Sequence, residues 1–169
     1  MSEGAVVWFT GLPSSGKSTL AEAVRRRLLG AGRAAVRLDG DEVRHALVPA
    51  PGYWPAERDA FYETLARLAA LLAGQGLTVL VAATAHRRAH RARARELAPR
   101  FLEVHVATPA ADCEARDVKG LWAAARAGKA PLLPGAGIDY EPPEAPDVVA
   151  AGGLDEAAAA AVAARLAAA

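Results

Sequence analysis

This sequence of 169 residues contains few cysteines and few lysines, and its net charge is close to zero. The single cysteine, Cys113, excludes a disulfide within the chain and is typical of a protein of the reducing cytoplasm. A formal net charge of +1 provides no overall field that would attract nucleic acid or an anionic membrane. No apolar stretch is long and uncharged enough to cross a bilayer, and the N-terminus does not resemble a signal peptide. We therefore expect a cytoplasmic protein with no nucleic-acid or membrane partner.

Apolar residues, by contrast, make up 53% of the chain, which is enough for one compact domain over residues 1–169. Short apolar segments alternate with segments of helical periodicity, and glycine or proline follows several expected helix ends. This alternation predicts an α/β fold with three layers, in which helices cover both faces of a mainly parallel, five-stranded sheet. The expected strands are 5–10, 34–39, 77–83, 101–107 and 147–149. The expected helices are 17–29, 41–47, 56–74, 87–98, 110–127 and 154–167.

A glycine-rich motif follows the first expected strand. Residues 11–18 read Gly-Leu-Pro-Ser-Ser-Gly-Lys-Ser, the G-x-x-x-x-G-K-S pattern of a Walker A phosphate loop. Glycines let backbone N–H groups converge on phosphate oxygens, and the N-terminus of the following helix adds partial positive charge. The motif therefore predicts that the chain binds a nucleoside triphosphate on a P-loop, nucleotide-kinase-like fold. The residues expected to bind it are Gly11, Ser14, Ser15, Gly16, Lys17, Ser18 and Thr19.

Two acidic residues, Asp39 and Asp41, follow the second expected strand, and we expect them to share the chemistry with Lys17. One carboxylate could join the Ser18 hydroxyl in holding Mg²⁺, and the other could accept the proton of an attacking hydroxyl. We assign Asp39 to the metal and Asp41 to the proton, although the sequence leaves the reverse assignment open. An Asx turn with an N-cap would use the same residues, and both roles can coexist. Arg44, one helical turn further, could pair with a substrate anion.

Residues 110–146 combine a basic helix with a long loop rich in glycine and proline. Such a loop inside a compact domain is typically a lid or a binding loop, and a lid would keep water from the transferred phosphate. Lys119 lies in this lid region. Only three of the 20 basic residues are lysines, at positions 17, 119 and 129, so Lys119 is a candidate for a second site that requires a compact ammonium. An ordinary surface lysine is the alternative.

Residues 86–95 hold five arginines and two histidines. Because a helix cannot point all of them in one direction, we expect most to form a solvated face. Arg87, Arg88 and Arg91 lie nearest the end of a strand and could instead bind acceptor anions. A nucleic-acid patch is disfavoured by the near-neutral charge and by the lack of interleaved aromatic residues.

Taken together, these segments resemble the adenylylsulfate (APS) kinase family, P-loop enzymes that phosphorylate the ribose 3′-hydroxyl of adenosine 5′-phosphosulfate. The run Cys-Glu-Ala-Arg-Asp-Val-Lys-Gly-Leu at 113–121 is the most specific match. The resemblance implies ATP as the phosphoryl donor, Mg²⁺ on Ser18, Asp41 as the base, and allows a homodimer. Further matches, in the family's order, are 11–19, 38–41 with 43–45, 101–106, 125–128 and 140–143. The residues that the resemblance assigns to the acceptor are Arg44, Tyr53, Arg58 and Lys119.

Three departures from the family pattern lie in the expected acceptor site. Residues 61–64 read Phe-Tyr-Glu-Thr where the family has Asn-Ile-Arg-Arg, residues 85–87 read Ala-His-Arg for Ser-Pro-Tyr, and residues 133–135 read Leu-Pro-Gly for Phe-Thr-Gly. Losing a polar group and a stacking ring should weaken the binding of an adenine base. Phosphorylation of APS is our leading hypothesis. The alternatives are a kinase for another hydroxyl acceptor, such as a nucleotide conjugate, sugar or antibiotic, and a nucleotide-binding module without catalysis.

Overall fold

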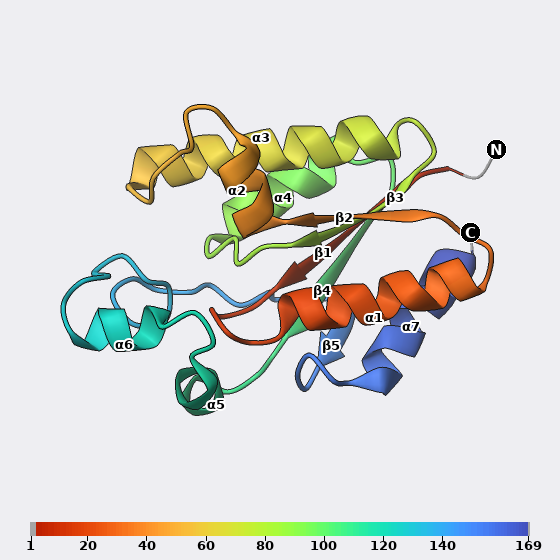
Figure 1. Cartoon of the computed structure of the whole chain (residues 1–169). Helices are drawn as coiled ribbons and strands as arrows, with labels where there is room; N and C mark the ends of the chain where they lie inside the picture. The colour runs from red at the N-terminus through yellow and green to blue at the C-terminus, as the bar shows by residue number, and fades with distance from the viewer. Residues whose placement is uncertain (1–2, 169) are drawn as a thin grey trace.

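The five expected strands form one all-parallel sheet in the computed structural model, which describes residues 3–168 (Figure 1). The strand order is β2-β3-β1-β4-β5, so β1 lies in the middle with β3 and β4 on either side. Every residue of β1 is buried, as expected for a strand covered on both faces. The strands are β1 Ala5–Thr10, β2 Ala35–Asp39, β3 Thr78–Ala82, β4 Phe101–Val106 and β5 Val148–Ala150.

Helices pack on both faces of this sheet and complete the three predicted layers. Figure 1 shows α1 (Lys17–Gly30) and α7 (Glu156–Ala167) on one face, with α3 (Pro55–Ala73) and α4 (Arg88–Leu97) on the other. The side chains of β1 point alternately to the two faces of the sheet, and each face has a hydrophobic core. Val7 and Phe9 pack toward α1 and α7, while Val6 and Trp8 pack toward α3 and α4. The short helix α2, Gly40–Ala46, follows β2 directly. The α/β prediction is confirmed, and the sheet is wholly rather than mainly parallel.

The helix expected over 110–127 is wrong as a single element. The structure has two short helices there, α5 (Ala110–Arg116) and α6 (Leu121–Arg126). Asp117 ends α5 with φ of 31°, and Gly120 precedes α6 with φ of 68°. Both values belong to the left-handed region, which a right-handed helix cannot contain, so the chain turns between the two helices.

The lid region forms a small core of its own beside the sheet. Cys113, Trp122 and Leu133 are its buried members, and Leu12 of the glycine-rich loop packs against them. In Figure 1, α5 and α6 lie apart from the layers of helices that cover the sheet. The region therefore contacts the rest of the molecule partly through the loop that follows β1.

The arginine-rich segment is not simply a solvated face, because Arg91 is only 1% exposed. Its Nε donates to Glu103 Oε2 at 2.9 Å, its Nη2 donates to the Glu141 carbonyl at 2.7 Å, and its Nη1 donates to the Ala85 carbonyl. Arg91 thereby ties α4 to β4 and to the end of the lid region. The other four arginines form ion pairs near the surface: Arg87–Asp59, Arg88–Glu144, Arg93–Glu63 and Arg95–Asp147.

No helix within residues 3–168 combines the length and the apolar character that crossing a membrane requires.

We predict that Arg91→Met lowers the free energy of unfolding by about 3–5 kcal/mol, because it leaves the half-buried Glu103 carboxylate without its partner. Arg95→Met is the matched control on the same helix. The Arg95 pair with Asp147 is longer, at 3.5 Å, and more exposed, so its loss should cost less than about 1 kcal/mol. Urea unfolding followed by circular dichroism measures both, and equal losses for the two variants would contradict the buried role of Arg91.

Candidate active site

The glycine-rich loop after β1 adopts a conformation that only some of its residues tolerate. Gly16 has φ of 97° and Ser14 has φ of 64°. A Cβ on Gly16 would lie 2.7 Å from the backbone of Gly153, so glycine is required for space as well as for φ. The turn is closed by a bond from the Ser15 N–H to the Leu12 carbonyl at 3.1 Å. The loop is therefore curled in the way that the Walker A pattern predicts.

Two further contacts bear on whether this loop fits a phosphate group. Thr108, just after β4, donates through Oγ1 to the Ser15 carbonyl at 2.6 Å and holds the loop from behind. The Ser15 hydroxyl oxygen is buried and has no hydrogen-bond partner among residues 3–168. A buried hydroxyl without a partner is uncommon, and a phosphate oxygen is one group that would satisfy it. The curled backbone and this free hydroxyl fit an anionic ligand.

The Lys17 side chain, at the start of α1, folds back over the loop. Its Nζ donates to the Gly11 carbonyl at 3.1 Å and to the Leu12 carbonyl at 2.8 Å. Burial, together with the nearby charge of Lys119, lowers the pKa of Lys17 to about 8. This partly buried ammonium contacts carbonyls and no carboxylate of residues 3–168, so it is available to a phosphate.

The side chains of Ser18 and Asp39 meet at the end of β2, and Asp41 follows in the first turn of α2. The Ser18 hydroxyl donates to Asp39 Oδ2, and Asp39 Oδ1 accepts from the Asp41 N–H at 3.0 Å. Asp39 therefore caps α2 while keeping one oxygen on Ser18, so the capping and functional interpretations are compatible. A hydroxyl and a carboxylate are oxygen ligands of the kind that Mg²⁺ takes, with waters and phosphate completing its shell. Among the described residues, no cluster of three or more His, Cys, Asp or Glu could hold a metal by itself.

The lid region brings Lys119 to Asp41. The Lys119 ammonium contacts Asp41 Oδ2, and the two side chains are 57% and 48% exposed. The pair spans 78 residues of sequence and joins the turn between α5 and α6 to the first turn of α2. The cation and the carboxylate thus lie beside one another at the edge of the sheet that carries Lys17.

Arg44 and Arg58 form a second group with aromatic residues. The Arg44 guanidinium carbon lies 4.0 Å from the Phe61 ring centre and 4.3 Å from the Tyr53 ring centre, so the cation stacks with both rings. Arg58 donates to the Tyr53 carbonyl at 2.8 Å and to the Leu132 carbonyl of the lid region at 2.7 Å. The Tyr53 side chain keeps about half of its surface exposed, at 51%.

Both guanidinium groups are buried, since Arg44 and Arg58 are each 6% exposed. Arg44 donates to the Pro51 and Gly52 carbonyls at 3.2 and 2.7 Å, and neither arginine forms an ion pair with a carboxylate of residues 3–168. Burial lowers the pKa of Arg58, and the charge of Arg44 adds to this effect. Buried cations without anionic partners are rare, because desolvation is costly unless a counter-charge compensates for it.

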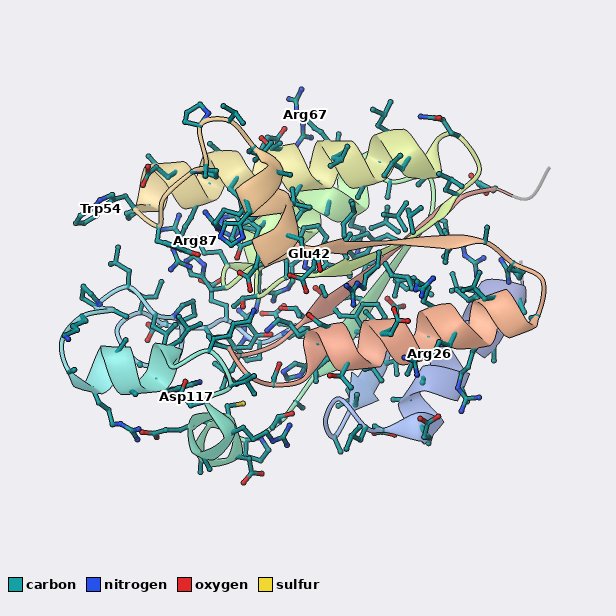
Figure 2. The ribbon with its side chains drawn as sticks, viewed as in Figure 1. Arg26, Glu42, Trp54, Arg67, Arg87 and Asp117 are labelled. Atoms are coloured by element: carbon teal, nitrogen blue, oxygen red, sulfur yellow. The ribbon has the colours of Figure 1, made fainter. Side chains whose placement is uncertain are left out.

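The sequence alone did not indicate the roles of three residues near this site. Trp122 donates from its indole N–H to the Pro13 carbonyl at 3.0 Å. Asp117, labelled in Figure 2, accepts from two backbone N–H groups of α6. The Tyr140 hydroxyl lies 2.9 Å from Thr10 Oγ1, next to the glycine-rich loop. All three lie in segments that match the family, but nothing in the local pattern indicates these distant partners.

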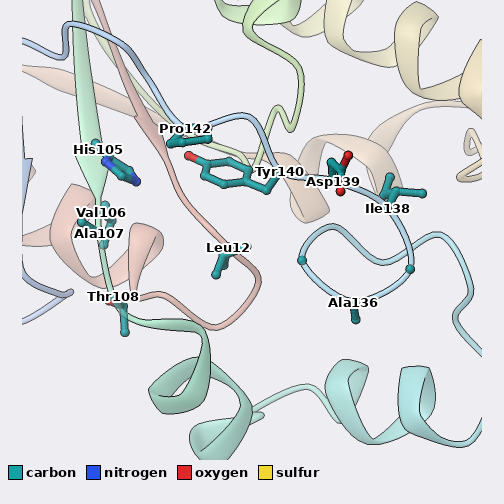
Figure 3. Close-up of a pocket in the computed structure, with 12 residues that line it drawn as sticks. Leu12, His105, Val106, Ala107, Thr108, Ala136, Ile138, Asp139, Tyr140 and Pro142 are labelled. Carbon is teal, nitrogen blue, oxygen red and sulfur yellow. The ribbon is translucent and has the colours of Figure 1, made fainter.

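A cavity of about 440 Å³ lies between the glycine-rich loop, the end of β4 and the lid region (Figure 3). Leu12, Tyr140 and Ile138 form part of its wall. Lys17, Asp39 and Asp41 do not line it, so this cavity is distinct from the cluster that could act on a phosphate. The remaining lining residues are His105, Val106, Ala107, Thr108, Gly135, Ala136, Gly137, Asp139 and Pro142.

The family model described as adenylylsulphate kinase matches residues 3–151 of this chain. The adenylyl-sulfate kinases of Shewanella denitrificans and Citrobacter koseri are 45% and 46% identical to this chain over 145 and 148 residues. These matches cover 85% and 86% of this chain and 71% and 74% of the two relatives.

A solved structure extends the likeness to three dimensions. The Mycobacterium tuberculosis APS kinase CysC, in complex with AMPPNP and APS, is 43% identical and superposes with a TM-score of 0.83, covering 88% of each chain. Fold and sequence agree over nearly the whole length. This chain is a member of the adenylylsulphate kinase family.

Proposed function

We propose that this protein transfers the γ-phosphoryl group of ATP to the 3′-hydroxyl of APS, giving ADP and 3′-phospho-APS. Membership of the family and relatives named adenylyl-sulfate kinase support the reaction. The observation that carries the acceptor assignment is the buried pair Arg44 and Arg58, which has no carboxylate partner in the part of the chain that the structure describes. A phosphosulfate anion would supply the missing counter-charge.

The donor would be bound by the glycine-rich loop. Lys17 would exchange its bonds to the Gly11 and Leu12 carbonyls for bonds to the β- and γ-phosphates. Ser18 and Asp39 would hold Mg²⁺, which when bound neutralises charge on the phosphates. After this exchange the Lys17 ammonium would lie beside the phosphate oxygens that gain negative charge during transfer.

Asp41 would orient the acceptor hydroxyl and accept its proton. Its carboxylate is half exposed at the end of β2 and contacts Lys119, so it is both reachable and held in place. Lys119 would in addition bring a positive charge toward the phosphoryl group in transit. The pair therefore supplies orientation and charge stabilisation from two sides of the site.

The acceptor base would pack on Tyr53, whose ring is half exposed. Phe61 stands where the family has Asn, and it stacks on Arg44 at 4.0 Å, so it would hold the arginine rather than form a polar contact with the acceptor. Leu133 stands where the family has a second stacking ring, and it is buried in the lid core with Trp122. This burial favours, as a second candidate, a kinase for a different anionic hydroxyl acceptor that needs only one stacking ring.

A coupled assay of ADP release tests the two candidates. Purified protein with Mg²⁺-ATP is supplied with APS, adenosine 5′-monophosphate, or a panel of neutral sugars and aminoglycosides. We expect rapid ADP release with APS and little with the sugars, which are uncharged, or with the aminoglycosides, which are cationic. Turnover of adenosine 5′-monophosphate in preference to APS would favour the second candidate. Turnover of a sugar or an aminoglycoside in preference to APS would overturn both the proposed acceptor and the role of the buried arginines.

Asp41→Asn should reduce phosphoryl transfer by at least about 100-fold, because the amide cannot accept the proton. Binding of ATP should change less than about threefold, since Asp41 lies outside the glycine-rich loop. Single-turnover kinetics and calorimetric titration with an ATP analogue measure the two effects. Turnover of this variant at the wild-type rate would contradict the assignment of Asp41 as the base.

The affinity for ATP should fall as the pH rises through about 8, where buried Lys17 loses its proton in the free protein. Below this pKa the ammonium is already charged. Above it, binding must first restore the proton, so the dissociation constant should rise by up to about tenfold per pH unit. Calorimetry between about pH 6.5 and 9.5 measures the profile. Lys17→Met should bind more weakly with no break near pH 8, and a break that persists in this variant would assign it to another group.

A further inference from the structure

We propose that Trp122 and Asp117 are positioning residues for phosphoryl transfer, because together they attach the turn that carries Lys119 to the glycine-rich loop. Neither residue need touch the donor or the acceptor. The proposal rests on the proposed function. In it, the lid region rigidly connects the loop that binds phosphate to Lys119, the cation beside Asp41.

Asp117 fixes the turn from both sides. Its Oδ1 accepts from the Trp122 N–H at 2.8 Å and its Oδ2 accepts from the Ala123 N–H at 2.9 Å, so both carboxylate oxygens cap the first turn of α6. Its own N–H donates to the Cys113 carbonyl at 3.0 Å and its carbonyl accepts from the Gly120 N–H at 2.9 Å. The backbone on each side of Lys119 is therefore held by the same residue.

Trp122 attaches this turn to the glycine-rich loop. Its ring is only 5% exposed and packs with Cys113 and Leu133, while its indole N–H donates to the Pro13 carbonyl at 3.0 Å. The two preceding carbonyls of the loop, those of Gly11 and Leu12, accept from Lys17. Three consecutive carbonyls of one loop thus serve the phosphate-binding lysine and the lid region.

The ion pair between Lys119 and Asp41 cannot fix this geometry on its own. Both side chains are about half exposed, and exposed ion pairs are weak because water screens them and long side chains lose freedom. Lysine is also flexible, so its head group is only as well placed as its backbone. The scaffold of Asp117 and Trp122 must therefore supply the precision that the pair lacks.

The test removes each contact with little other change. Trp122→Phe keeps an aromatic ring in the lid core and loses the N–H. Asp117→Gly removes the cap, and glycine tolerates the φ of 31° at this position without strain. Each variant should lower kcat for APS by about 10- to 100-fold while the KM for ATP changes less than about threefold. Asp117→Asn, which keeps one capping oxygen, should recover most of the loss.

A double-mutant cycle separates positioning from general destabilisation. If Trp122 acts through Lys119, adding Trp122→Phe to Lys119→Met should lower kcat by less than about twofold further. Multiplicative losses, or an unchanged kcat in both Trp122→Phe and Asp117→Gly, would overturn the proposal.

Trp8→Phe is the matched control, because Trp8 also donates an indole N–H to a carbonyl, that of Ala83 at 3.2 Å, but lies in the core between the sheet and the helices α3 and α4. This variant should lose stability without changing kcat more than about twofold. An equal loss of kcat in Trp8→Phe and Trp122→Phe would overturn the proposal. A wild-type protein that fails to phosphorylate APS would instead refute the proposed function, so the two failures can be told apart.

Discussion

The parallel direction of all five strands is the constraint on which the candidate site depends. Because the strands run the same way, the glycine-rich loop after β1, Asp39 at the end of β2 and Thr108 after β4 meet at one edge of the sheet. Groups separated by more than 90 residues of sequence, such as Ser15 and Thr108, thereby lie within hydrogen-bond distance. Two of the three non-glycine residues with positive φ among residues 3–168, Ser14 and Ala85, lie at the same edge, and the third, Asp117, lies in the lid region.

A buried polar network beneath this edge fixes where the lid region returns to the sheet. Arg91 joins Glu103 of β4 to the Glu141 carbonyl, and the Tyr140 hydroxyl meets Thr10, whose Oγ1 donates to the Thr84 carbonyl at 2.6 Å. Every member of this network is bonded, which is the condition under which buried polar groups make a structure rigid. The end of the lid region near Tyr140 is thus held firmly, and the turn at its other end depends on the contacts of Trp122.

The sequence predicted the layers and the strands because they follow from the local spacing of apolar residues. It predicted the curled loop because the glycines of the Walker A motif indicate one. It also predicted that Ser18 and Asp39 lie in one site, since parallel strands bring their carboxyl ends to the same edge of the sheet, although β3 lies between β1 and β2. It did not predict the break at Asp117, because a helical pattern continues through that residue, and the structure interrupts it with left-handed φ values at both Asp117 and Gly120. Nor could it predict the burial of Arg91, whose acceptors lie on β4 and at residue 141, far away in sequence.

The unequal use of arginine and lysine follows from what each cation must do. Arg91 and Arg58 each bond two or more fixed acceptors at once, which suits a planar group with several donors in a set geometry. Lys17 has a different task in the proposed reaction, because its ammonium must leave the carbonyls of its own loop and follow the phosphate. A compact charge on a flexible stem can do this, whereas a guanidinium fixed to several acceptors would have to break all of those bonds together. Lysine is therefore kept where the cation has to change partners, in a chain that uses arginine for most of its other basic residues.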